Sequence, residues 1–190
     1  RSQLLKAGGK AFVKEDSETF LNLNEIINTI LELGGIPCYP VLLDDSKGFI
    51  TSFEQDYERL YKELSSNNIY CIELIPGRND PGKLEEFVRF FQSKNYIILF
   101  GTEHNSPDLH PVTVTTKNGD PLNDYLQRVS YEGACVIAAH QYMRAKGMNG
   151  FINNNNISLE TRKKKYIETG AAIIEYYLQF RPKLYSEKPS

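Results

Sequence analysis

The sequence predicts an α/β protein with three parallel βα units and further helices towards the C-terminus. Three short apolar segments, 36–43, 69–75 and 97–100, recur at similar spacing, and an amphipathic segment precedes each of them. Because alternating helices and apolar strands are typical of βα repeats, we expect a parallel sheet with right-handed crossover connections. We further expect one domain over 1–190, with the βα repeats in 22–105.

The first unit begins with a helix at Asn22. Asn22 and Glu25 have the spacing of a capping box, apolar residues follow at helical intervals, and Gly34-Gly35 ends the helix. The apolar segment 36–43 is then predicted to be a strand. Its two prolines count against a strand, because neither can donate to a strand ladder.

The second and third units repeat this arrangement. Apolar residues at helical spacing between 53 and 64 predict a helix, and the strand at 69–75 follows it. Asp80-Pro81 is a helix start, since aspartate caps the first turn and proline suits the first helical position. The apolar run at 97–100 reads as a strand buried on both faces.

The remaining chain, 106–182, is predicted to hold a loop and two long helices. Pro, Thr, Asn, Gly and Asp dominate 106–123, which is therefore expected to be a loop. One helix is expected over 125–146, and a second begins after Ser158 and runs to about Tyr177. The basic run at 162–165 is expected to form a solvated helix face.

Composition excludes several classes of protein. A formal net charge of -2 argues against bulk nucleic-acid binding, and no apolar stretch approaches the roughly 18 residues of a membrane span. The three cysteines lie in apolar contexts and are predicted to be buried free thiols. We expect a cytoplasmic protein, although the start at Arg1 rather than Met leaves export open.

The chemistry is expected where the strand at 97–100 ends. Glu103, His104 and Asn105 follow it directly, and α/β folds place their active sites at the carboxyl ends of strands. Glu103 and His104 are candidate ligands of a divalent metal such as Zn, Mn or Fe, with the Asn105 amide completing the shell. Alternatively, His104 acts as a general base, or the cluster only satisfies loop backbone groups.

Other candidate residues lie near the same edge of the predicted sheet. Glu73 precedes the end of the second strand, where a buried carboxylate needs a partner such as Arg78. Tyr39 is expected to point towards the same edge, and His110 to fold back over it. Asp44 is expected to be an exposed loop residue, and His140 a packing residue of its helix.

Three of these segments resemble motifs of the PHP family of metal-dependent phosphoesterases. Family members have Gly-Gly before a strand ending in Ala-His-Pro, then Gly-Ile-Glu, then Gly-Ser-Asp-x-His. The corresponding segments here are 34–40, 70–73 and 101–105. Tyr39 stands where the family has a histidine ligand, and Asn105 where it has the last histidine, so Glu103 is the ligand that carries over directly.

The resemblance implies a distorted (β/α)7 barrel of which this chain would be the C-terminal portion, since three βα units cannot close a barrel. A metal-bound water would then attack a phosphoester of a small molecule. Glu103 would be a ligand, His104 a ligand or base, and Asn105 and Tyr39 substrate contacts. The rivals are a sugar isomerase or lyase on a TIM-like barrel, and a non-catalytic barrel remnant that acts as a binding or structural module.

Overall fold

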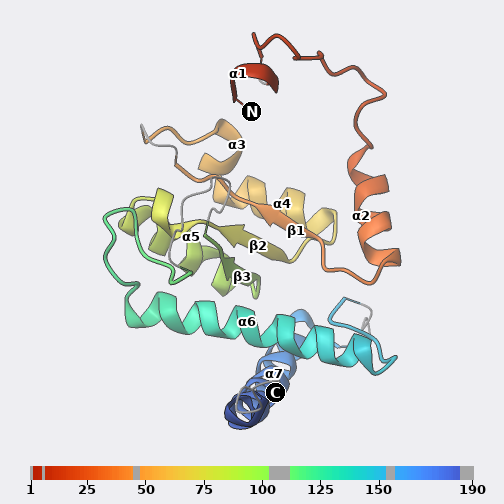
Figure 1. The fold of residues 1–190 in the computed structure, drawn as a ribbon, viewed down its shortest axis with the longest axis vertical. Helices are drawn as coiled ribbons and strands as arrows, with labels where there is room; N and C mark the ends of the chain where they lie inside the picture. Colours follow the sequence, from red (N-terminus) through yellow and green to blue (C-terminus); the bar gives the residue numbers. More distant parts are fainter. Residues whose placement is uncertain (1, 6, 45–47, 103–111, 153–156, 185–190) are drawn as a thin grey trace, which may run out of the picture.

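A computed structural model describes residues 2–5, 7–44, 48–102, 112–152 and 157–184 of the chain (Figure 1). The elements follow in the order α1 (Ser2–Leu5), α2 (Leu23–Glu32), β1 (Cys38–Pro40), α3 (Ser52–Gln55), α4 (Tyr57–Ser66), β2 (Cys71–Leu74), the 3-10 helix η1 (Pro76–Arg78), α5 (Pro81–Ser93), β3 (Ile97–Phe100), α6 (Asp124–Ala145) and α7 (Leu159–Leu184).

The sheet has three parallel strands in the order β1-β2-β3. In the register, Cys38 lies beside Cys71, and Cys71 beside Ile97. Each strand lies within the segment in which the sequence predicts one. The capping box at Asn22 is also present, since Asn22 accepts a hydrogen bond from the Glu25 N–H while the Glu25 carboxylate accepts one from Asn22.

The predicted partial TIM-like barrel is wrong. The described residues form a small open sheet with helices on both sides: α4 and α5 lie on one side, and α6 and α7 on the other (Figure 1). In a barrel, the second side would be filled by side chains from other strands. Here helices occupy that side, which is the arrangement of an open α/β sheet.

The first face of the sheet, defined as the side towards α4 and α5, packs large side chains. Ile72, Leu74 and Ile98 from the strands pack in one buried cluster with residues of α5, namely Leu84, Phe87, Val88 and Phe91. Aromatic rings meet edge to face in this layer, with 5.1 Å between the ring centroids of Phe91 and Tyr96. This face therefore holds most of the core.

The second face, defined as the side towards α6 and α7, packs closely through glycines. A Cβ at Gly133 of α6 would collide with the Ile98 carbonyl of β3, and a Cβ at Gly170 of α7 would collide with the Cys135 carbonyl of α6. Glycine therefore lets α6 approach the sheet and lets α7 cross α6. Beside these crossings, Cys71 and Ile97 pack with Val136.

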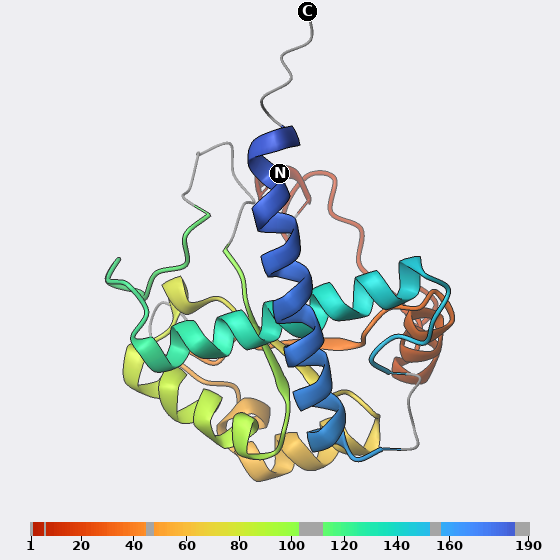
Figure 2. The ribbon, with the colours of Figure 1, turned by 90° about the horizontal axis from the view of Figure 1, so that it is seen from below.

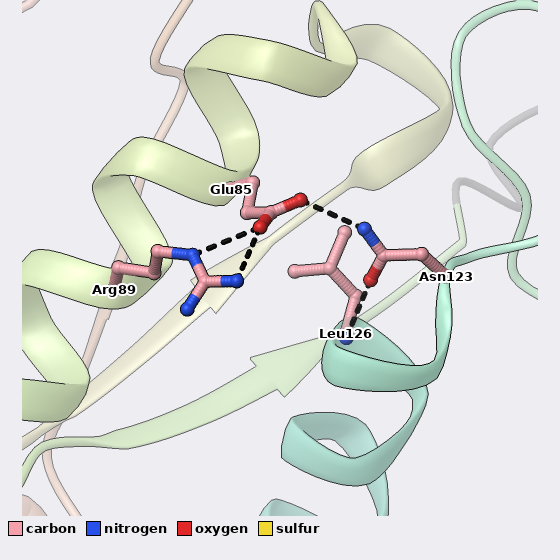
Figure 3. A network of polar contacts seen from close by, with 4 residues as sticks. All are labelled: Glu85, Arg89, Asn123 and Leu126. Carbon is pink, nitrogen blue, oxygen red and sulfur yellow. Dashed lines mark hydrogen bonds and ion pairs between the residues drawn. The ribbon is translucent and has the colours of Figure 1, made fainter.

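A polar network fixes the start of α6 against α5 (Figure 3). The Asn123 side chain accepts a hydrogen bond from the Leu126 N–H, which caps α6, and donates to Glu85 Oε2 across 2.7 Å. Arg89 donates to the other oxygen of Glu85. The hydrogen bonds from Arg89 and Asn123 lower the pKa of Glu85, so the carboxylate stays charged.

Candidate functional site

The strongest candidates from the sequence, Glu103, His104, Asn105 and His110, lie outside the described residues. Their roles, including a divalent metal held by Glu103 and His104, stay predictions. Among the described residues, no group of three or more His, Cys, Asp or Glu side chains is placed to hold a metal ion. The remaining candidates, Tyr39, Glu73 and Arg78, lie at or after the ends of β1 and β2.

Tyr39 and the Glu54 carboxylate together stabilise the loop after β1, and Glu54 was not among the residues singled out from the sequence. Glu54 of α3 is buried and accepts hydrogen bonds from the N–H groups of Leu42 and Leu43, at 3.1 and 3.0 Å. The Tyr39 hydroxyl donates to the same carboxylate across 3.4 Å. Burial and the Glu54 charge raise the pKa of Tyr39 to about 12, so the phenol remains a neutral donor.

Asp44 is buried, and the expectation of an exposed loop residue is wrong. Its carboxylate accepts hydrogen bonds from the Asn79 side chain at 3.1 Å and from the Asp80 N–H. Asn79 also donates to the Leu42 carbonyl across 2.9 Å. Asp44 thereby joins the loop after β1 to the loop after β2, because its carboxylate satisfies donors that burial would otherwise leave unpaired.

Glu73 lies on the second face and is exposed, although the sequence analysis treats it as a buried carboxylate. Its side chain lies over Gly101, where an added Cβ would be 2.8 Å from Glu73 Oε1. On the neighbouring strand, Cys38 and Pro40 are exposed as well. Within the described residues, the second face therefore has an exposed edge along β1 and an exposed carboxylate near the carboxyl end of β2. Arg78 in η1 is also exposed.

A cleft of about 440 Å³ opens between α6 and α7. Tyr131 of α6 lines one wall, and the other wall consists of residues from α7: Ile174, Glu175, Leu178 and Gln179. Figure 2 shows α7 crossing α6, with its C-terminal half on the same side as the C-terminal end of β3. The lining of the cleft therefore combines apolar side chains with a hydroxyl, a carboxylate and an amide. Interaction with Cys135 is the main cause that raises the pKa of the Tyr131 hydroxyl.

Ile174 and Leu178 lie four residues apart, a spacing that is typical of the inner face of a packed helix. Leu178 is instead 57% exposed, because α7 continues beyond its crossing with α6. The spacing of apolar residues gave no sign of a cleft, since it cannot tell a wall of an open cleft from a packed core position.

His140 has the packing role that the sequence analysis expects. Its Nδ1 accepts a hydrogen bond from the Phe151 N–H across 2.9 Å, and Nε2 lies 2.9 Å from the Gly34 carbonyl. Because Nδ1 accepts, Nε2 carries the proton and donates to Gly34. Burial lowers the pKa of His140, so the imidazole is neutral and joins α6 to the end of α2.

The basic run at 162–165 is not a wholly solvated face, since Arg162 and Lys163 are buried. The Lys163 ammonium donates to the Gln92 side chain at 2.7 Å and to the Tyr96 carbonyl at 2.8 Å. Burial lowers the pKa of Lys163 to about 8. Lys163 therefore anchors the first turns of α7 beside the start of β3.

Comparisons with known proteins give distant relatives. The chain is similar to the major strawberry allergens Fra a 1-D and Fra a 1-B of Fragaria ananassa, each 22% identical over 143 residues, which cover 71% of this chain and 87% of the relative. Fra a 1-A of the same plant is 21% identical over 143 residues. No family model matches the chain. No solved structure matches it either.

The predicted membership of the PHP family is therefore wrong. The predicted function of a metal-dependent phosphoesterase, which followed from that membership, is wrong as well. The relatives found are allergens, and the described residues hold no metal-binding group. The motifs behind the prediction are short, and a strand that ends in glycine and polar residues suits many α/β sheets. The alternative function of a sugar isomerase or lyase required the same barrel, so it is wrong for the same reason.

Within the described residues, no helix is both long and apolar enough to cross a bilayer.

Proposed function

We propose that this protein is a non-catalytic module that binds a small apolar molecule in the cleft between α6 and α7. The observation that carries the proposal is the cleft itself, about 440 Å³ in volume. This volume lies within the range of about 300–1,000 Å³ for ligand sites in proteins, which combine apolar walls with a few polar groups, and the cleft is open to solvent, with Tyr131 and Leu178 exposed. Ile174 and Leu178 supply apolar surface here, and Tyr131 adds an aromatic ring.

The polar groups of the cleft indicate what such a molecule would carry. Glu175 and Gln179 lie one helical turn apart and present a carboxylate and an amide on the same wall. A carboxylate accepts hydrogen bonds and repels anions. A neutral or cationic molecule with an N–H or O–H donor on an apolar body therefore fits this lining better than an anion does.

The lining also supports binding rather than turnover. The five side chains that line the cleft include no histidine, cysteine or serine. Interaction with Cys135 raises the pKa of Tyr131, so its phenol stays protonated near neutral pH and is not an anionic nucleophile. The most frequent arrangement for covalent catalysis, a serine or cysteine beside a histidine, is therefore missing from these five residues.

Titration with N-phenyl-1-naphthylamine tests the proposal. This probe is a neutral aromatic amine that fluoresces in apolar surroundings, and the chain contains no tryptophan that would interfere. We expect saturable binding to the unmodified protein. Leu178→Ala should weaken it roughly tenfold, since contact with one leucine contributes about 1.4 kcal/mol.

Leu33→Ala is the matched control, because Leu33 is an exposed leucine next to the end of α2 and outside the cleft. It should bind the probe as the unmodified protein does, and circular dichroism should show that both variants fold. Equal affinity in Leu178→Ala and Leu33→Ala, or fluorescence that rises without saturation, would contradict binding in the cleft.

A further inference from the structure

Two cysteines face each other across β1 and β2. Cys38 and Cys71 are direct partners in the parallel register. Partners in register point to the same face of a sheet, so both thiols lie on the second face. A hydrogen bond with Cys38, together with burial, raises the pKa of the Cys71 thiol. Both cysteines are free thiols in this structure.

The two thiols differ in access to solvent. Cys38 is exposed, although the sequence analysis predicts a buried thiol, whereas Cys71 is fully buried as predicted. A dissolved oxidant can therefore reach Cys38 but not Cys71. This division matches the roles of an exposed thiol that reacts with the oxidant and a neighbouring resolving thiol that then forms the disulfide. Cys135, the third cysteine, is buried in α6 and lies outside the pair.

We propose that Cys38 and Cys71 form a reversible oxidation site, in which a hydroperoxide converts the two facing thiols into an intramolecular disulfide. The Cys38 thiol loses its proton, and the thiolate attacks the terminal oxygen of the hydroperoxide to become a sulfenic acid. The O–O bond breaks, and the leaving alkoxide or hydroxide takes up the proton lost by Cys38 to give an alcohol or water. The Cys71 sulfur then attacks the Cys38 sulfur. The S–O bond breaks, and the hydroxide leaves with the Cys71 proton as water. The two thiols together lose two electrons, and the hydroperoxide gains them.

The geometry fits this step because adjacent strands lie about 4.8 Å apart, within the range of separations that a disulfide spans. A bond between neighbouring strands would need little backbone movement. An exposed disulfide of this kind is also accessible to reducing thiols, so the oxidation can be reversed. The site is independent of the proposed ligand cleft, since neither cysteine lines it.

Treatment of the reduced full chain with a slight excess of hydrogen peroxide tests the site. The number of free thiols counted after denaturation should fall from three to one, and the mass should fall by two hydrogen atoms. Trypsin separates the three cysteines into the peptides 15–47, 63–78 and 129–144. Without reductant, peptides 15–47 and 63–78 should be found linked, and dithiothreitol should separate them.

Two variants make the result specific. Cys135→Ser should form the same link, with no free thiol remaining, whereas Cys38→Ser should keep both of its thiols. Cys38 is exposed, so its replacement by serine should leave the fold intact. Retention of all three thiols, a Cys38 sulfinic acid beside a free Cys71, or a dimer linked through Cys38 would each overturn the proposal.

Discussion

The two faces of the sheet are built differently. On the first face, large side chains from α4 and α5 pack against the strands, and Leu84, Phe87 and Phe91 are completely buried. On the second face, α6 and α7 approach through Gly133 and Gly170. Among the described residues, Cys38 at the start of β1 and Glu73 near the end of β2 are exposed on the second face.

This difference suggests that the first face mainly determines stability, whereas the helices of the second face provide the proposed ligand cleft. Burial of large apolar side chains dominates the free energy of folding, so the first face should contribute most of it. The second face depends on close contacts at a few glycines, and it leaves both a cleft and exposed reactive groups. Substitutions on the two faces should therefore have different consequences.

The largest effect is expected on the first face, from Phe87→Ala. Phe87 is fully buried, and the centroid of its ring lies 4.6 Å from the ring centroid of Phe91. Truncation should lower the free energy of unfolding by about 3–5 kcal/mol, because it removes apolar contacts and leaves a cavity. Urea denaturation measures this change. Glu86→Ala, the exposed neighbour on α5, should change it by less than about 0.5 kcal/mol. A similar loss in both variants would contradict the assignment of the core to this face.

A smaller effect is expected on the second face, from Gly170→Ala. Alanine normally stabilises a helix by about 1 kcal/mol relative to glycine. Here the new methyl group would collide with the Cys135 backbone, so α7 should be displaced and stability should fall by about 1–3 kcal/mol. Glu168→Ala, at an exposed position of the same helix, should be nearly neutral. A more stable Gly170→Ala variant would show that α6 and α7 do not cross closely at this point.

The smallest effect concerns pH and His140. Its pKa is lowered in the folded protein, so below about pH 6.5 the unfolded chain binds a proton that the folded protein does not. The free energy of unfolding should therefore fall from pH 7 to pH 5.5, by less than about 1.4 kcal/mol per pH unit. His140→Leu should remove most of this slope. The Glu85 carboxylate, whose pKa is lowered from 4.5, affects stability only at lower pH. An unchanged slope in the variant would contradict a buried neutral imidazole.

Local patterns in the sequence predicted local structure well. The run 97–100 predicted β3 with the same bounds, and Asp80-Pro81 predicted the cap at the start of α5. The capping box at Asn22 was also predicted and is confirmed. Each of these depends on residues within one turn or one strand, where backbone hydrogen bonds and side-chain spacing decide the outcome.

Long-range features could not be predicted in this way. Three βα units occur in barrels and in open sheets alike, and only the placement of α6 and α7 distinguishes them. Glu54 and Asp44 each bind a loop that lies elsewhere in the sequence. Lys163 is buried because α7 starts beside β3, although its run of charges is typical of a solvated face. The cleft results from the crossing of two helices, which no spacing within either helix specifies.

A chemical-shift map of the protein with bound N-phenyl-1-naphthylamine tests the binding cleft most directly. Isotope-labelled protein would be titrated with the probe, and amide and methyl resonances followed by NMR. We expect the largest shifts at Tyr131, Ile174 and Leu178, and none at residues of the first face such as Phe87 and Phe91. Shifts centred on the first face, or spread evenly over the molecule, would contradict a ligand site between α6 and α7.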